Sequence, residues 1–328
     1  MRRVSIVGAA GYTGQETLDR VLAHPDLKVA ALGSDSLAGQ AASELDPRLS
    51  RSSLPSFVPN AEALAHDADV MILCLSHEAA AAIGGFPDDR VVVDLSGAHR
   101  LRDAASYAQW YGFEHPHPES LGTWVYGLPE LVAETGSLIA NPGCYATATL
   151  LALAPLRDEI DPASVVVDGL SGMTGAGRSL KSASHAGAVL ENVTPYRVGA
   201  HQHVPEIAQL LGFPVSFTPH LLPVRRGLIA TCNVRSTGAD LRALLEAAYA
   251  DSPVVSVLPP GFAPDLARVQ HTDRAEIGVF DDRFTDRTVV ICAEDNLGKG
   301  AAGQAIQNVN RFLGLEPTAG LRLDGVLV

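Results

Sequence analysis

The stretch Val4-Ser5-Ile6-Val7-Gly8-Ala9-Ala10-Gly11-Tyr12-Thr13-Gly14 lies near the start of this 328-residue chain and decides the fold of its first half. A short apolar run ends at Gly8, and the helical pattern that follows has Leu18, Val21 and Leu22 on one face. Glycines at such a turn let the backbone approach a pyrophosphate, which the N–H groups of the helix N-terminus bind. The turn predicts a dinucleotide site formed by Gly8, Ala10, Gly11, Tyr12, Thr13 and Gly14. The alternative is a plain turn with packing glycines.

Short apolar runs alternate with helical patterns through the first half of the chain. Further strands are expected at 27–32, 70–75 and 91–95, and runs that are apolar on both faces are typical of a parallel sheet covered by helices. In the second half, strands are expected at 165–167, 215–222, 228–234, 254–258 and 289–292, with a clear helix at 241–249. That pattern predicts an α+β unit with a mostly antiparallel sheet. A last helix at about 302–313 is expected to pack on the first unit.

Composition excludes several classes of protein. The chain has 24 basic and 37 acidic residues, a net charge of −13, and no basic tract, so nucleic acid is not an expected partner. No apolar stretch reaches the length of a membrane span, and the N-terminal run is a strand rather than a signal peptide. Four scattered cysteines fit reduced thiols, which predicts a cytoplasmic protein.

The end of the second strand bears on the choice of dinucleotide. Ser34 stands at its tip, where an NAD site has an acidic residue, and its hydroxyl can donate to a 2′-phosphate. Ser36 nearby suits a phosphate as well, so NADP is the predicted cofactor. If Asp35 binds the ribose instead, the cofactor is NAD. Ser76 and His77, after the third strand, are expected near the cofactor.

Cys144 is the candidate nucleophile. It follows Asn141-Pro142-Gly143 and begins an apolar helical run, so it lies at a predicted helix N-terminus. The positive end of the helix dipole is expected to lower the pKa of the thiol and activate it. Cys74, Cys232 and Cys292 lie in strands and are expected to be inert. The alternative is that Cys144 is a buried cysteine that starts a core helix.

A cysteine nucleophile needs an acid/base partner, and the stretch His201-Gln202-His203-Val204-Pro205-Glu206 offers two histidines and a carboxylate. Spacing does not decide between His201 and His203, and Glu206 is expected to orient whichever of them acts. An HxH pair with a nearby glutamate also suits a metal, but no further ligand set of suitable spacing is evident, so no metal is expected. Arg178, in a Gly-rich turn, is expected to clamp a carboxylate or phosphate; a surface arginine in a loop is the alternative.

Several motifs occur together in a fixed order: Gly8 to Gly14, Asp94-Leu95-Ser96, Tyr126-Gly127-Leu128-Pro129-Glu130, Asn141 to Tyr145, Ser171 to Arg178 and His201 to Ile207. The set resembles the N-acetyl-gamma-glutamyl-phosphate reductase family, of the aspartate-semialdehyde dehydrogenase superfamily, over about residues 3–313. The chain departs from the family pattern at Gln202, where arginine is usual, and at Gly97-Ala98-His99-Arg100, where an acidic-aromatic-arginine stretch is usual.

The resemblance implies an α/β fold in which a Rossmann-type domain, residues 1–143 plus 297–328, carries an inserted α+β catalytic and dimerisation domain, residues 144–296. It implies reduction of an acyl phosphate, N-acetyl-glutamyl 5-phosphate, by NADPH through a thioacyl group on Cys144, and a homo-oligomer, dimer or tetramer. It adds Gly175, Asn296 and Leu297 as cofactor residues. The substrate candidates are Ser96, Arg100, Asn141, Ser171, Gly172 and Arg178, with Arg100 and Asn141 at the phosphate.

Three alternatives stay open. A close relative that acts on a carrier-protein-bound aminoadipyl phosphate shares most of these motifs. Aspartate-semialdehyde dehydrogenase and other phosphorylating aldehyde dehydrogenases share the thioacyl chemistry. A nucleotide-sensing protein without catalysis would keep the fold but form no thioester.

Overall fold

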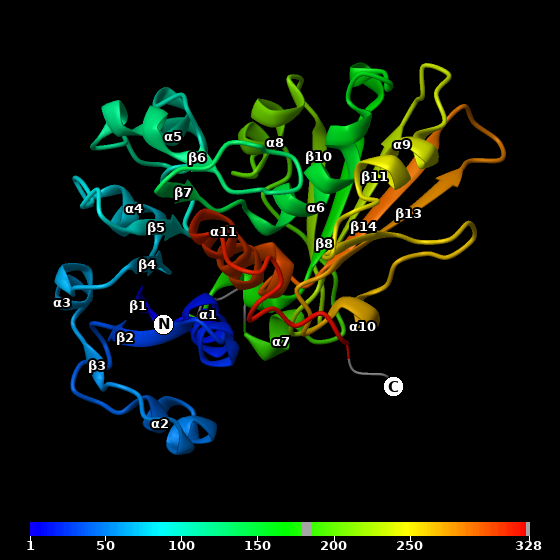
Figure 1. The fold of residues 1–328 in the computed structure, drawn as a ribbon. Coiled ribbons are helices and arrows are strands. Elements are labelled where there is room, and N and C mark those ends of the chain that lie inside the picture. The colour runs from blue at the N-terminus through cyan, green and yellow to red at the C-terminus, as the bar shows by residue number, and fades with distance from the viewer. Residues whose placement is uncertain (179–184, 326–328) are drawn as a thin grey trace.

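The computed structural model describes residues 1–178 and 185–325 and contains two seven-stranded sheets (Figure 1). The strands of the first sheet run in the order β3-β2-β1-β4-β5-β7-β6, and every neighbouring pair is parallel. Their bounds are β1 Arg2–Val7, β2 Leu27–Gly33, β3 Phe57–Val58, β4 Val70–Leu73, β5 Val91–Asp94, β6 Val125–Tyr126 and β7 Leu138–Ala140. The strand order reverses between β1 and β4, and a ligand of a doubly wound sheet binds at the carboxyl ends of such strands.

Helices cover both faces of the first sheet, which is why its central strands β4 and β5 are buried at every position. These helices are α1 Tyr12–Ala23, α2 Ala42–Leu45, α3 Asn60–Ala65, α4 His77–Ala81 and α5 Ala105–Trp110. The last helix, α11 Gly303–Leu313, lies beside α1 although 280 positions separate them in the chain (Figure 1). Its apolar residues Ala305, Ile306 and Val309 share one core cluster with strands β1, β4 and β5.

The second sheet has the order β12-β13-β14-β11-β8-β10-β9. Its strands are β8 Val166–Ser171, β9 Thr194–Pro195, β10 Ser216–Leu221, β11 Leu228–Val234, β12 Val255–Val257, β13 Ala275–Asp281 and β14 Thr288–Glu294. Four neighbouring pairs are antiparallel, while β8–β10 and β12–β13 are parallel. The predicted α/β fold with a second, mostly antiparallel unit is confirmed, although β13 was not expected from the sequence.

One face of the second sheet is covered by α6 Cys144–Leu153, which is buried at every position after Cys144. Helix α8 Val204–Leu211 packs against α6, and α9 Leu241–Ala248 lies on the same core. Two short helices, α7 Ala186–Val189 and α10 Leu266–Val269, and short 3-10 turns complete the fold. A π-helical turn, Gly298–Ala302, leads directly into α11.

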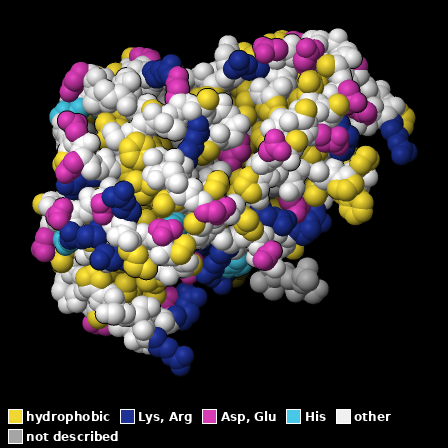
Figure 2. Space-filling model, viewed as in Figure 1, with side chains coloured by type: hydrophobic (Ala, Val, Ile, Leu, Met, Phe, Trp, Pro, Cys, Tyr) yellow, Lys and Arg dark blue, Asp and Glu magenta, His cyan; other side chains and the backbone are white. Residues whose placement is uncertain are grey.

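The surface agrees with the mixed charge of the sequence. Acidic and basic side chains are interspersed over the face in Figure 2, with no extended basic area on it. Over the residues that the structure describes, no helix combines the length and the apolar character needed to cross a bilayer.

Candidate active site

The β1–α1 turn is built for close backbone approach. Gly8 has φ +82°, and a Cβ there would lie 2.4 Å from the Cys74 carbonyl oxygen. A Cβ on Gly14 would lie 2.5 Å from the Gly8 carbonyl oxygen, so α1 packs tightly onto the turn. Gly11 precedes the first helical residue and no side chain caps the helix. The N–H groups at this helix N-terminus are therefore suited to an anionic ligand, and the glycine cradle fits a dinucleotide pyrophosphate.

At the tip of β2, Asp35 has different hydrogen-bond partners from Ser34 and Ser36. The Asp35 carboxylate accepts hydrogen bonds from the backbone N and the side-chain Nδ2 of Asn60, both at 2.8 Å. Asn60 Oδ1 in turn accepts from the Gly8 N–H at 3.0 Å. Ser34 Oγ and Ser36 Oγ lie 3.3 Å apart. The carboxylate is thus held on Asn60, a residue that the sequence analysis did not select, and this arrangement favours the serines over Asp35 as cofactor ligands.

Two residues after β4 have structural partners. Ser76 Oγ caps α4 by accepting from the Ala79 N–H at 3.3 Å. His77 Nδ1 accepts from the Gly97 N–H at 2.8 Å, and its Nε2 lies 3.2 Å from Gln202 Nε2. His77 therefore joins the first sheet's loops to the histidine segment, which places it between the two units. A cofactor role for Ser76 and His77 remains a prediction.

Cys144 lies at the start of α6, as the sequence predicts, and is half-buried. The expectation of a low thiol pKa is wrong for the free protein. Burial, followed by the charge of Glu294, raises the pKa of the Cys144 thiol to about 12, and the nearby Arg100 guanidinium lowers it less than burial raises it. Loss of hydration outweighs the dipole of a helix end, which is worth about 0.3–1 kcal/mol at most sites. Cys144 is therefore a thiol at neutral pH until something deprotonates it.

The two histidines lie at the cysteine turn. The His203 ring packs so closely against Gly143 that a Cβ on Gly143 would lie 2.3 Å from His203 Nε2. The His201 and His203 ring centroids are 4.7 Å apart, and both rings contact Tyr145 edge-on. Burial lowers the pKa of His201 to about 4 and holds the pKa of His203 well below its usual value. Both imidazoles are therefore neutral at pH 7.

Hydrogen bonding distinguishes the histidines. The backbone N–H of His203 donates to His201 Nδ1 at 3.2 Å, so neutral His201 carries its proton on Nε2 and can donate it. His203 Nδ1 is buried and has no hydrogen-bond partner among the described residues. Across residues 1–178 and 185–325, no group of three histidine, cysteine or acidic side chains is placed to hold a metal ion.

Glu206 does not orient a histidine, contrary to the expectation. Its Oε1 accepts from the Gly143 N–H at 2.8 Å and from the Tyr126 hydroxyl at 2.7 Å. Its Oε2 lies 3.5 Å from Arg100 Nη1. Because α8 brings Glu206 under the cysteine turn, the carboxylate holds the backbone before Cys144 and anchors the Arg100 cation there.

Ser96 and Asn141 have hydrogen-bond partners within the fold. Ser96 Oγ donates to Asp94 Oδ2 at 2.8 Å and accepts from the Ala98 N–H. Asn141 is fully buried; its Nδ2 donates to the Ala301 carbonyl, and its Oδ1 accepts from Asn308. These bonds fix both side chains at the strand ends beside the cysteine turn, and their substrate contacts stay predictions.

Arg100 remains suited to an anion. Its guanidinium is 6% exposed and is held by hydrogen bonds to the carbonyls of Asn141, at 2.7 Å, and Leu95, at 2.8 Å. Burial lowers the pKa of the Arg100 guanidinium, but the charges of nearby acidic groups, of which Glu206 has the largest effect, raise it above the ordinary value. A fixed cation thus lies beside the cysteine turn.

Arg178 lies beside the glycine turn. Its Nη1 donates to the Ala10 carbonyl of that turn at 3.0 Å. With Tyr12, Thr174 and Leu297 it lines a cavity of about 720 Å³ between α1 and the 173–178 turn. This position is next to the predicted cofactor site, and the substrate role of Arg178 stays a prediction.

The 171–175 turn and Asn296 come together, as their predicted roles require, although no contact tests those roles. Ser171 Oγ donates to the Gly172 carbonyl at 3.2 Å and lies 3.4 Å from the position of a Cβ on Gly175. Asn296 Oδ1 accepts from the Gly227 N–H, and its Nδ2 donates to Thr174 Oγ1. Leu297 donates its N–H to Asp295 Oδ1 at the start of the π-helical turn.

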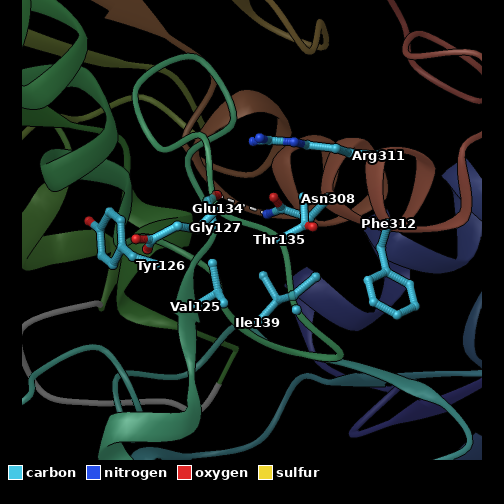
Figure 3. A pocket seen from close by; sticks show the side chains of 10 residues that line it. Val125, Tyr126, Gly127, Glu134, Thr135, Ile139, Asn308, Arg311 and Phe312 are labelled. Atoms are coloured by element: carbon cyan, nitrogen blue, oxygen red, sulfur yellow. Dashed lines mark hydrogen bonds between the residues drawn. The ribbon is translucent and has the colours of Figure 1, made fainter.

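Helix α11 fixes the loop that precedes β7, which the sequence did not reveal. Figure 3 shows Asn308 pointing to Gly127, whose carbonyl accepts from Asn308 Nδ2 at 2.8 Å. Arg311 lies along the same helix and donates to the Val132 carbonyl at 2.6 Å. The pocket between them has about 10 Å³, room for roughly one water and not for a substrate. This clamp positions Tyr126, the partner of Glu206.

Comparisons with known proteins agree with this geometry. Residues 3–138 match the family described as "Semialdehyde dehydrogenase, NAD binding domain", and residues 144–296 match "Semialdehyde dehydrogenase, dimerisation domain". Solved structures of similar fold include aspartate semialdehyde dehydrogenase II of Vibrio cholerae, with a TM-score of 0.72, 16% identity and 96% and 98% of the two chains covered. The structure of aspartate semialdehyde dehydrogenase with NADP from Candida albicans has a TM-score of 0.64 and 16% identity, and the match covers 96% of this chain and 99% of that one.

Relatives with closer sequences carry a single name, N-acetyl-gamma-glutamyl-phosphate reductase. The protein of Acidothermus cellulolyticus is 44% identical over 99% of this chain and 98% of the relative, and that of Salinispora arenicola has the same identity and coverage. The protein of Geobacter sp. (strain M21) is 43% identical over 98% and 99%. On these grounds the chain belongs to the N-acetyl-gamma-glutamyl-phosphate reductase family.

Proposed function

We propose that this protein is an acyl-phosphate reductase that converts N-acetyl-L-glutamyl 5-phosphate and NADPH to N-acetyl-L-glutamate 5-semialdehyde, phosphate and NADP, a step of arginine synthesis. The observation that carries the proposal is the turn at Gly143 and Cys144, where a thiol and two neutral histidines meet in a chain 44% identical to proteins of that name. A cysteine beside neutral imidazoles is the arrangement that acyl transfer to sulfur requires.

The glycine turn, Ser34 and Ser36 would hold NADPH. The cradle at Gly8 and Gly14 leaves no room for side chains between strand and helix, as a bound pyrophosphate requires. Asp35 is engaged with Asn60, which supports NADP over NAD. When bound, the cofactor supplies the hydride. The role of the protein is to align the cofactor with Cys144 and to exclude water.

The first half-reaction forms a thioester. A neutral imidazole, of which His203 is the better placed because its ring packs on Gly143, takes the Cys144 proton. The thiolate adds to the acyl carbon, and the carbon–oxygen bond to phosphate breaks with its electron pair leaving on phosphate. Arg100 stabilises the anionic charge next to the turn.

The second half-reaction releases the aldehyde. Hydride addition to the Cys144 thioester gives a thiohemiacetal oxyanion. His201, whose ring contacts Tyr145 and which carries its proton on Nε2 in the neutral state, donates that proton to the oxyanion. On collapse the hydroxyl proton returns to His201, the carbon–sulfur bond breaks with its electron pair on sulfur, and the semialdehyde leaves. The thiolate then takes back the proton that His203 removed in the first half-reaction. General acid catalysis of this kind contributes typically 10²–10⁴-fold.

A second copy of the chain would cover the outer face of the second sheet. Along β8, β11 and β14 buried residues face α6, and half-buried ones alternate with them. The half-buried set includes the apolar residues Leu170, Ile229, Val289 and Ile291. The same face carries the polar residues Asp168, Thr231 and Asn233, so it combines apolar and hydrogen-bonding groups as an interface does. Pairing through it to a dimer or tetramer is the proposed assembly.

The proposed division into units keeps the boundaries 1–143 plus 297–328, and 144–296. Packing of α11 against α1 and β5 supports it. Cys144 then stands at the junction of the two units, where a cofactor held by one can meet a substrate held by the other. The four free thiols support a reducing compartment, the cytoplasm.

The test is a steady-state assay of the purified protein with N-acetyl-glutamyl phosphate and either NADPH or NADH. Matched assays use aspartyl phosphate and a carrier-bound aminoadipyl phosphate. Turnover with N-acetyl-glutamyl phosphate at least tenfold above the other two substrates supports the proposal. Preference for either competitor, or no thioester trapped on Cys144 with any of them, overturns it.

A further inference from the structure

Glu294, at the end of β14, is a buried acid that the reaction described above does not use. Its side chain is 0% exposed. Neither carboxyl oxygen has a hydrogen-bond partner within residues 1–178 and 185–325. A buried carboxyl group without such partners is costly when it is ionised. A feature of this kind at the end of a central strand therefore calls for a functional explanation.

Glu294 and Cys144 contact the same glycine. A Cβ on Gly300 would lie 2.6 Å from Glu294 Oε1 and 2.8 Å from Cys144 Cβ. The carboxyl group and the nucleophile thus lie close to each other, each against the backbone of Gly300. Any larger residue at position 300 would separate the two groups, so the geometry holds them close.

The groups around Glu294 leave it without a partner cation. Lys299, from the π-helical turn, is 0% exposed, but its Nζ donates to Glu130 Oε1 at 2.6 Å and to Gln307 Oε1 at 2.8 Å. Asp295 follows Glu294 in the chain and adds like charge. Burial above all, with Asp295 and Glu130 adding to it, holds the pKa of Glu294 well above the ordinary value despite the attraction of Lys299.

The groups that act on Cys144 come from several elements. Burial is the largest influence on its pKa; after it, the charges of Glu294 from β14 and Glu206 from α8 raise the pKa, while Arg100, from the loop after β5, lowers it. Glu206 is neutralised by contact with Arg100 and two hydrogen bonds, whereas Glu294 is not. Two adjacent buried acids cannot both ionise readily, since each charge disfavours the other.

We propose that Glu294 is a positioning residue for the nucleophile: its negative charge, when present, disfavours the Cys144 thiolate, so the cysteine and the carboxyl group share a single negative charge between them. Only the purpose of this charge coupling rests on the proposed function. That purpose is to keep the cysteine unreactive until substrate and histidine are in place. The charge coupling itself is a property of the free protein.

The test is alkylation of the substrate-free protein with iodoacetamide, followed across pH by mass spectrometry of the Cys144 peptide. In Glu294→Gln the midpoint of the rate–pH curve should fall by roughly one unit, which is roughly tenfold faster alkylation below the wild-type midpoint. Glu294→Met removes the same charge without an amide and should shift the midpoint in the same direction. An unchanged midpoint in both variants overturns the proposal.

Matched controls separate charge coupling from loosening of the fold. Glu276→Gln changes another buried carboxylate of the second sheet, one that is paired with Arg268 and Arg274, and should leave the Cys144 midpoint unchanged. An equal shift in Glu276→Gln would overturn the proposal. Because the assay needs no substrate, it gives its answer even if the reductase assays fail.

Discussion

The β1–α1 turn and the β7–α6 turn are built alike and behave differently. Each follows a parallel strand of the first sheet, each has a glycine before the helix, and neither helix has a side-chain cap. At α1 the glycine Gly11 is half-exposed and Tyr12 is exposed, so the helix end faces solvent. At α6 the Gly143 N–H already donates to Glu206, and the residues after Cys144 are buried.

The comparison shows that a helix N-terminus has no fixed chemical effect. The open end at α1 can receive an anion because the N–H groups of its first turn donate to no acceptor in the described part of the chain. At α6 a carboxylate already occupies part of the positive end, and burial raises the pKa of the thiol instead of lowering it. The first turn is therefore suited to binding an anion, whereas the thiol at the second turn requires a base before it can react.

The largest effect is expected at the second turn. Cys144→Ser should reduce the reductase rate by roughly 10⁴-fold, because a hydroxyl is a far weaker nucleophile at this pH. NADPH affinity, measured by fluorescence titration, should stay within about threefold, since the cofactor turn is separate. Cys232→Ala, a change in the buried core of β11, is the control and should keep the activity of the folded protein. Full activity in Cys144→Ser would remove Cys144 as the nucleophile.

Alanine at each turn glycine should separate binding from chemistry. Gly8→Ala meets a carbonyl oxygen at positive φ and should lower the free energy of unfolding by about 2–4 kcal/mol and weaken NADPH binding. Gly143→Ala displaces the His203 ring and should reduce kcat by roughly 100-fold with cofactor affinity intact. Urea unfolding, cofactor titration and kcat measurements on both variants provide the check. If Gly143→Ala mainly weakened NADPH binding, the contrast between the turns would be wrong.

The histidines at the second turn should make stability depend on pH. Because the folded pKa of His201 is about 4, below the unfolded value of about 6.5, the unfolded chain binds more protons between these values. The stabilisation from neutral His201 is therefore complete above about pH 6.5 and is lost as pH falls toward 4. His201→Gln should reduce this loss by up to about 3 kcal/mol. Urea unfolding at pH 7.5 and pH 4.5 measures it, and equal pH dependence in both proteins would contradict the burial argument.

The smallest effect is expected at the edge of the first turn. Asp35→Asn keeps the side chain beside Asn60 and should change the KM for NADPH by less than about threefold, because the carboxylate already accepts two hydrogen bonds from Asn60. Ser34→Ala should raise that KM more, roughly fivefold, by removing one hydroxyl donor. Steady-state kinetics with both cofactors test the pair. A larger effect at Asp35 than at Ser34, with good use of NADH, would support an NAD site.

Local features of this molecule could be predicted from its sequence, whereas features that depend on distant packing could not. The glycine turn and the helix after Cys144 follow from residues within one strand–turn–helix unit. The thiol pKa was mispredicted because burial of the side chain and, after it, the charge of Glu294, 150 positions later, decide it. The partners of Glu206 and Arg178 likewise come from other elements, α8 against the cysteine turn and the 173–178 turn against α1.

Strand β13 was missed for a related reason. Its sequence from Ala275 to Asp281 contains Glu276 and Gly278, which interrupt an apolar pattern. Pairing with β14 buries the strand all the same, because Glu276 finds Arg268 and Arg274 on either side. The compensating charges are invisible in a pattern of apolar residues.

The position of α11 has a consequence for synthesis on the ribosome. The helix supplies core residues to β1 and β5 and four buried amides, among them Asn308 and Asn310, which hold the loop before β7 and the end of α1. During translation the first sheet is complete once Ala140 has been added, but it lacks this cover until α11 begins at Gly303, 163 residues later. The emerging chain therefore carries an exposed apolar face until α11 has been made, and truncation by a stop codon before α11 would leave a product suited to chaperones and proteases.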